Sequence, residues 1–122
     1  MAKESLKDMV IPEIPQDEAV LKEGVVNVLM VVGGNRRRSV FKYAITDRGL
    51  WTRNKGVLWI KPRSTFLPYS NIESYKRTKY FNTESMVFFL KSGKRPGGQI
   101  IFDDMPGALE VLNKYIKVRE GK

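Results

Sequence analysis

The chain has 122 residues, of which 42% are apolar and 29% are charged, and its net charge is +9. This composition is typical of a single folded domain and excludes a wholly disordered chain. The sequence contains no Cys and no His, which excludes disulfides, thiolate chemistry and imidazole as a general base or metal ligand.

The positive charge is concentrated in the middle of the chain. Residues 25–102 contain fifteen Lys or Arg and three Asp or Glu, whereas residues 1–24 carry a net charge of −3 and residues 103–122 a net charge of 0. No apolar stretch approaches the roughly 20 residues of a membrane-spanning helix, and the first nine residues are too charged for a secretory signal. We therefore expect a cytoplasmic protein with a cationic surface that could also lie at the inner face of the membrane.

The N-terminal region is expected to be an extended arm over residues 1–17. Pro12 and Pro15 each fix φ and push the preceding residue out of the helical region. Asp17 is a candidate N-cap for a short helix over residues 18–23, which Gly24 would end.

A hairpin and five further strands are predicted before residue 103. Residues 25–32 form a β-branched apolar run, residues 33–35 (Gly-Gly-Asn) supply a turn, and residues 39–46 alternate between two faces. The other strands are expected at residues 50–55, 65–67, 72–77, 86–91 and 99–102. Residues 92–98 are rich in Gly and predict a turn between the last two strands.

The C-terminal region changes to a helical period. Asp104 is a candidate N-cap, and Pro106 is tolerated in a first helical turn. One apolar stripe consists of Met105, Ala108, Leu109, Leu112, Tyr115 and Ile116. We expect this amphipathic helix to cover the open end of the strand-rich body.

Three short segments resemble the pattern of bacterial pleckstrin-homology (PH) domains. They are residues 43–50 (Tyr-Ala-Ile-Thr-Asp-Arg-Gly-Leu), 56–58 (Gly-Val-Leu) and 66–72 (Phe-Leu-Pro-Tyr-Ser-Asn-Ile). The resemblance covers about residues 18–118, with residues 119–122 left as a disordered tail. It implies a mainly β, PH-like, partly open barrel of about seven antiparallel strands in two orthogonal sheets, capped by the C-terminal helix. Because this fold hosts lipid-binding, peptide-binding and oligomer-forming proteins, function must be argued from sites.

The first candidate site is a cluster of cations near the predicted hairpin turn. Arg36, Arg37 and Arg38 are expected on the loop between the first two strands, and Lys42 lies on the second strand. A guanidinium can bind phosphate through two parallel hydrogen bonds. In eukaryotic relatives of the resembled family this loop binds phosphoinositide head groups through a basic-x-Arg element, which Arg36 and Arg38 match in spacing. Three interpretations stay open: a solvated hairpin tip, a general attraction to anionic surfaces, and a specific head-group pocket.

The second candidate site is an apolar segment between cations. It comprises Val57, Leu58, Trp59, Ile60, Lys61 and Arg63, with Arg53 and Lys55 preceding it. An apolar tip surrounded by cations suits an interfacial membrane anchor, and it equally suits a protein interface, where Trp and Arg are common hot-spot residues. The third interpretation is that the aliphatic residues fold back into the core.

Two further patterns are weaker. Residues 76–81 alternate cations with Tyr80 and Phe81, a composition that could stack single-stranded RNA, although packing beneath a loop explains these aromatics better. Asp47, Glu73 and Glu84 are the carboxylates of the strand-rich region, and no motif pairs them for catalysis.

The sequence thus predicts a non-catalytic binding module without metal or cofactor. We expect it to associate with a protein partner or with copies of itself through strand edges and the Trp59 loop. Recruitment to anionic lipid through the arginine cluster is the alternative, and RNA binding is a distant third.

Overall fold

The computed structural model of the chain describes residues 8–56, 59, 61–80, 82–92 and 98–118. It is mainly β, with one α-helix near the C-terminus. The elements are β1 (Val20–Val32), β2 (Asn35–Thr46), β3 (Gly49–Arg53), β4 (Ser64–Pro68), β5 (Ile72–Tyr80), β6 (Thr83–Leu90), β7 (Gln99–Phe102), α1 (Met105–Leu112) and β8 (Lys117–Val118). The prediction that seven strands precede a C-terminal helix is therefore confirmed.

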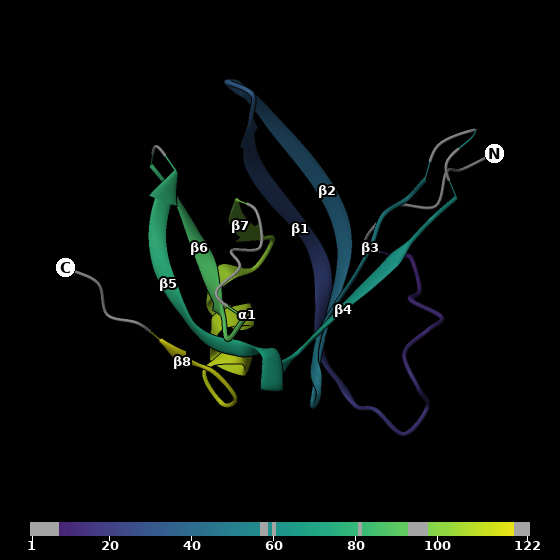
Figure 1. Cartoon of the computed structure of the whole chain (residues 1–122). Helices are drawn as coiled ribbons and strands as arrows, with labels where there is room; N and C mark the ends of the chain where they lie inside the picture. Colours follow the sequence, from purple (N-terminus) through teal and green to yellow (C-terminus); the bar gives the residue numbers. More distant parts are fainter. Residues whose placement is uncertain (1–7, 57–58, 60, 81, 93–97, 119–122) are drawn as a thin grey trace.

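The strands form one curled sheet in the order β4-β3-β2-β1-β7-β6-β5-β8 (Figure 1). Every pairing is antiparallel except that of β8 with β5, and β8 was not predicted. One half of the sheet consists of β2, β3 and β4, and the other consists of β5, β6, β7 and β8. β1 joins the two halves because it pairs with β2 along one edge and with β7 along the other. The two halves thus belong to a single sheet rather than to the two sheets that the resemblance implied, and α1 lies near one end of the curl (Figure 1).

The β1–β2 hairpin is confirmed, but its turn is shorter than predicted. Gly33 and Gly34 have φ angles of 57° and 81°, the left-handed conformation that a tight two-residue turn requires. β2 therefore begins at Asn35 and continues through Arg36, Arg37 and Arg38, which pair with β1. The prediction that the three arginines lie on a loop is wrong, because the two glycines complete the turn before them.

The predicted helix over residues 18–23 is also wrong. β1 begins at Val20 and pairs with β2 from the register Val20↔Thr46 onward, so backbone pairing with a distant strand overrides the local capping signal of Asp17. Gly24 is a strand residue and not a helix stop. A Cβ at this position would lie 2.4 Å from Oδ2 of Asp103, so only glycine lets that carboxylate approach β1.

The described residues before β1, 8–19, fold back on the sheet rather than extending as an arm. The backbone N–H of Ile14 donates to the carbonyl of Ile11 (3.3 Å), and that of Glu18 donates to Pro15 (3.1 Å). The Ile11 side chain is buried. We call residues 8–19 the N-terminal strap, because they lie against the face of the sheet opposite α1.

The core lies inside the curl and is closed by α1. Its largest fully buried side chains include Tyr43, Tyr75, Phe88 and Phe102. α1 contributes Met105, Ala108, Leu109 and Leu112.

The N-cap prediction for α1 is confirmed, because Oδ1 of Asp104 accepts a hydrogen bond from Gly107 N (3.2 Å). The helix ends at Leu112, before two members of the predicted stripe. Ile116 is still buried, whereas Tyr115 is half-exposed and stacks on Tyr69 with ring centroids 4.5 Å apart.

Candidate functional site

β4 is the terminal strand on one side of the sheet, so one of its edges faces no other strand among the described residues. Asn54 donates to the carbonyl of Arg63 (3.1 Å), and Tyr69 donates to the carbonyl of Arg48 (3.1 Å). Because hydrogen-bonding residues alternate along an antiparallel pair, the backbone groups of Ser64 and Phe66 point away from β3. This outward row of backbone donors and acceptors is the β4 edge, and it ends at Pro68, which has no N–H.

A groove of about 590 Å³ lies beside the beginning of β4. It is lined by Glu13, Asn54, Trp59, Lys61, Pro62, Arg63 and Ser64. Trp59 is 82% exposed, an unusual position for the largest side chain, and Lys61 and Arg63 are exposed as well. We call this feature the Trp59 groove; it combines an aromatic anchor with two cations next to the β4 edge.

The N-terminal strap places one carboxylate inside this groove. Both oxygens of Glu13 accept hydrogen bonds from Nη1 of Arg53 (3.1 and 3.0 Å), and Oγ of Ser64 donates to Oε1 (2.8 Å). The hydrogen bond from Ser64 lowers the pKa of the Glu13 carboxyl below its ordinary value, and a hydrogen bond from the backbone of Glu13 and the charge of Arg53 lower it further. Arg53 and Ser64 face each other across the β3–β4 pair, so the sheet holds these two donors side by side.

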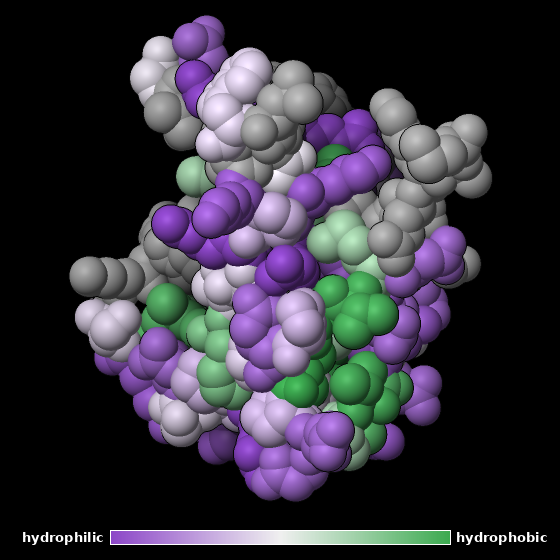
Figure 2. All heavy atoms as spheres, turned by 90° about the vertical axis from the view of Figure 1, so that its right-hand side faces the viewer, coloured by the Kyte–Doolittle hydropathy of each residue, from purple (hydrophilic) through white to green (hydrophobic). Residues whose placement is uncertain are grey.

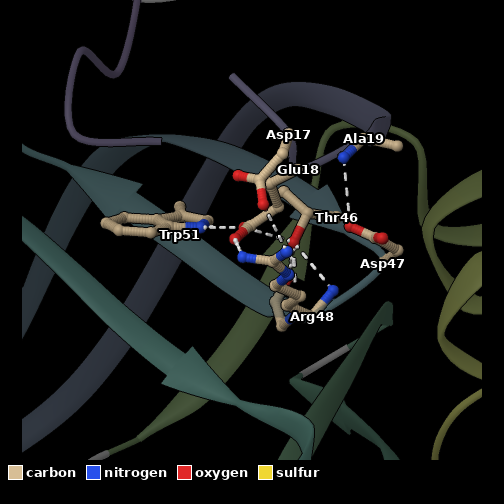
Figure 3. Close-up of polar contacts among 8 residues, drawn as sticks. Asp17, Glu18, Ala19, Thr46, Asp47, Arg48 and Trp51 are labelled. Atoms are coloured by element: carbon tan, nitrogen blue, oxygen red, sulfur yellow. Dashed lines mark hydrogen bonds and ion pairs between the residues drawn. The ribbon is translucent and has the colours of Figure 1, made fainter. Parts of the chain in front are cut away.

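A second carboxylate anchors the end of the strap more deeply. Glu18 Oε2 accepts from Nε1 of Trp51 (2.6 Å) and from Oγ1 of Thr46 (2.7 Å), and its other oxygen lies 3.7 Å from Arg48 (Figure 3). Asp17 pairs with the same guanidinium at 2.8 Å. We call Glu18, Thr46, Arg48 and Trp51 the Glu18 cluster; Figure 3 shows the carboxylate pointing between the ring of Trp51 and the Thr46–Arg48 turn.

Sequence reasoning missed both acidic contacts of the strap. The available signal was the difference in charge between residues 1–24, at −3, and residues 25–102, with fifteen cations and three carboxylates. Opposite charges on two segments of one chain favour their contact, although such a signal does not identify the pairs.

The predicted arginine cluster does not form one site with Lys42. Nε of Arg38 donates to Oδ1 of Asn27 (2.7 Å), and alternation along β2 directs the exposed Arg37 to the opposite face. The Lys42 side chain is buried and Nζ lies 3.1 Å from Oε1 of Glu23. Arg36 belongs to β2, paired with Val31. Arg37 and Arg38 thus lie on opposite faces of β2, and Lys42, on the face of Arg38, is buried beside residues of the strap.

The predicted apolar segment is described only in part. Val57, Leu58 and Ile60 lie outside the described residues, as do Phe81, most of the predicted turn at 92–98 and the predicted tail at 119–122. Trp59, Lys61 and Arg63 do come together, in the groove beside β4.

The face that carries the strap also exposes apolar side chains. Figure 2 shows a cluster of apolar residues bordered by hydrophilic ones on the side of the molecule that lies to the right in Figure 1. Exposed apolar residues of the strap and neighbouring strands include Val10, Val20 and Phe66. Phe66 stacks on Trp51 with centroids 4.5 Å apart, which joins β4 to the Glu18 cluster.

Within the described ranges, no three acidic residues gather as potential metal ligands, and no helix has the length and apolar character needed to cross a membrane. No protein-family model matches the chain, and no curated protein matches its sequence.

Proposed function

We propose that this chain is a non-catalytic binding module that associates with other proteins by adding an extended segment to its β4 edge. The segment belongs to a partner protein or to a second copy of the chain. The observation that carries this proposal is the position of the β4 edge beside a groove in which Trp59 is 82% exposed. Strand addition uses backbone groups for affinity and nearby side-chain sites for specificity.

Three features support a PH-like assignment of the fold. They are the strand order, the final helix beside the curled sheet, and the Thr-Asp-Arg turn. In that turn, Oγ1 of Thr46 accepts hydrogen bonds from the backbone N–H of Arg48 (3.1 Å) and of Gly49 (3.2 Å). The threonine of the motif therefore has a structural role, independent of any ligand. Because this fold serves several functions, the argument for association depends on the β4 edge and not on the fold.

The length of the edge limits what backbone pairing can contribute. Ser64 and Phe66 offer outward N–H groups, and each hydrogen bond to a partner strand is worth only about 1 kcal/mol net in water. The Trp59 side chain must therefore supply a large part of the affinity, as buried aromatic anchors commonly do at interfaces.

A titration with β-forming peptides tests this proposal. We expect that at least one of three peptides, in which Val alternates with Glu, Gln or Lys, will shift the backbone amide signals of Ser64 and Phe66 and the indole signal of Trp59 in ¹H–¹⁵N NMR spectra. Methylating alternate peptide nitrogens removes the donors on one edge, so the matched N-methylated peptide should leave these signals unchanged.

Light scattering over a concentration series tests the second-copy form of the same proposal. A protein that stays monomeric and responds to none of the three peptides would refute association through this edge.

Peripheral binding to anionic lipid is the second candidate function, and the exposed Trp59 flanked by Lys61 and Arg63 favours it. A Trp at head-group depth suits an interface, and each cation near an anionic membrane contributes about 1 kcal/mol.

Sedimentation with phosphatidylserine and phosphatidylcholine vesicles measures this second function. We expect K61E/R63E to abolish any pelleting with phosphatidylserine, because it reverses the charge beside Trp59. The matched variant R37E/R38E makes the same change in charge at the hairpin tip and should retain pelleting. The opposite pattern would place lipid binding at the tip, and no pelleting at low salt would exclude lipid binding.

A further inference from the structure

Glu13 occupies the Trp59 groove in the way that a ligand would. Its carboxylate comes from the strap, whereas both donors to it, Arg53 and Ser64, belong to the sheet. The Arg53 side chain is only 18% exposed, and the side chain of Glu13 is 47% exposed. The donors are thus fixed in the sheet, whereas the side chain of the acceptor is half-exposed.

The two donors are already arranged for a carboxylate. Nη1 of Arg53 donates to Oγ of Ser64 (2.8 Å) as well as to Glu13, and the Ser64 hydroxyl then donates to the same carboxylate. This chain of charge-assisted hydrogen bonds orients both groups before any partner arrives. A carboxylate from another chain would meet the same donors if Glu13 left them.

The groove keeps an excess of positive charge while Glu13 is present. Lys61 and Arg63 line the groove, and in the part of the chain that the structure describes neither forms an ion pair with a carboxylate. Together with Arg53, which pairs with Glu13, the site thus holds three cations and one carboxylate. An acidic segment placed along β4 would gain from these charges, whereas a basic segment would be repelled.

The charge also distinguishes between the two occupants considered above. A second copy that paired through its own β4 would present the sequence Ser-Thr-Phe-Leu-Pro, which contains no carboxylate. Its acidic strap is already engaged, because Glu13 and Asp17 pair with Arg53 and Arg48 of their own chain. A segment of another protein can carry the acidic side chains that the groove lacks.

We infer that the Trp59 groove and the β4 edge receive an acidic extended segment of a partner protein, and that Glu13 competes with this segment for Arg53 and Ser64. This inference rests on the proposed function and adds the chemistry of the partner and a built-in competitor. The strap then weakens the binding of every ligand by the free energy needed to displace Glu13.

The three alternating peptides measure the first part of the inference. We expect the Val–Glu peptide to bind at least 10-fold more tightly than the Val–Gln peptide, and the Val–Lys peptide not to bind. Equal affinity for the Glu and Gln peptides would overturn the acidic-segment inference and leave edge association intact. Binding of none of the three would overturn the acidic-segment inference, and would overturn edge association as well if the protein also stays monomeric. Pelleting with phosphatidylserine vesicles without binding of the Glu peptide would assign the same cations to lipid.

Variants of the strap measure the competition. Glu13→Ala should tighten binding of the Val–Glu peptide about 3- to 10-fold, a change of about 0.7 to 1.4 kcal/mol. Asp17→Ala is the matched control. It removes the same charge from the strap, but Asp17 pairs with Arg48 and not with Arg53, so this variant should change the affinity for the peptide by less than about twofold.

The gain in peptide affinity from Glu13→Ala should disappear in an Arg53→Gln background, because Glu13 competes through its ion pair with Arg53. Ser64→Ala offers the same comparison with less risk to folding, since it removes only the hydroxyl. A gain of equal size in Glu13→Ala and Asp17→Ala would refute competition, because it would reflect net charge alone.

Discussion

Replacing Glu18 by Ala is expected to lower the free energy of unfolding by about 3 kcal/mol, the largest effect of any single strap residue. The Glu18 side chain is only 2% exposed, and its carboxylate accepts hydrogen bonds from the Trp51 indole and the Thr46 hydroxyl. Truncation to Ala leaves both donors without this acceptor and leaves a cavity beside the stacked Trp51 and Phe66 rings.

Two matched variants separate the buried contacts from charge. Glu18→Gln keeps the size of the side chain and one acceptor oxygen, so we expect a loss about half as large. Asp17→Ala removes the neighbouring carboxylate, whose side chain is 71% exposed, and should cost less than about 1 kcal/mol, as exposed ion pairs do. Urea denaturation followed by far-ultraviolet circular dichroism gives all three values. Equal losses for Glu18→Ala and Asp17→Ala would show that the buried hydrogen bonds contribute nothing specific.

The strand pattern of this protein could be predicted because its signals are local. The Gly33–Gly34 pair favours a tight turn, a β-branched apolar run indicates the strand before it, and alternating apolar residues indicate the strand after it. Asp104, the N-cap of α1, lies only three residues before Gly107, whose backbone N–H donates a hydrogen bond to it, so this cap too can be identified within a short window of sequence.

The strap and the groove could not be predicted because their contacts are distant in sequence. Glu18 meets Thr46 and Trp51 at separations of 28 and 33 residues, and Glu13 meets Arg53 at 40. The local pattern after Asp17 resembles a capped helix, and only pairing with β2 reveals a strand. The same limit applies to Lys42, whose cationic side chain is buried beside Glu23 although the sequence suggests an exposed anion site.

Stability is expected to fall steeply above about pH 10, where tyrosines of the unfolded chain ionise. Tyr43, Tyr69 and Tyr75 all have a pKa raised above the ordinary tyrosine value, in each case first because burial disfavours the phenolate. The charge of Asp103, which accepts a hydrogen bond from the Tyr43 hydroxyl at 3.1 Å, raises the pKa of Tyr43 further.

The direction of the pH dependence follows from the proton balance. Above the ordinary tyrosine pKa, the folded state keeps a proton on each of these tyrosines that the unfolded state has lost. The contribution of each tyrosine to the free energy of unfolding is therefore fully present below its pKa in the unfolded chain, and it is lost as the pH rises through its pKa in the folded chain. The loss for a fully buried tyrosine such as Tyr43 has an upper limit of about 1.4 kcal/mol per pH unit.

Urea denaturation at pH values from 8 to 12, with phenolate absorbance recorded in parallel, checks this expectation. Tyr43→Phe removes the ionisable group but keeps the ring that packs edge-on against Phe102 at a centroid distance of 4.7 Å. Its stability at neutral pH should fall by about 1 kcal/mol through loss of the hydrogen bond to Asp103. Above pH 10 its stability should decline less steeply than that of the parent, because one of the three phenols with a raised pKa is gone. Parallel curves for the two proteins would mean that Tyr43 ionises equally readily in the folded and unfolded chains, which its burial against Asp103 argues against.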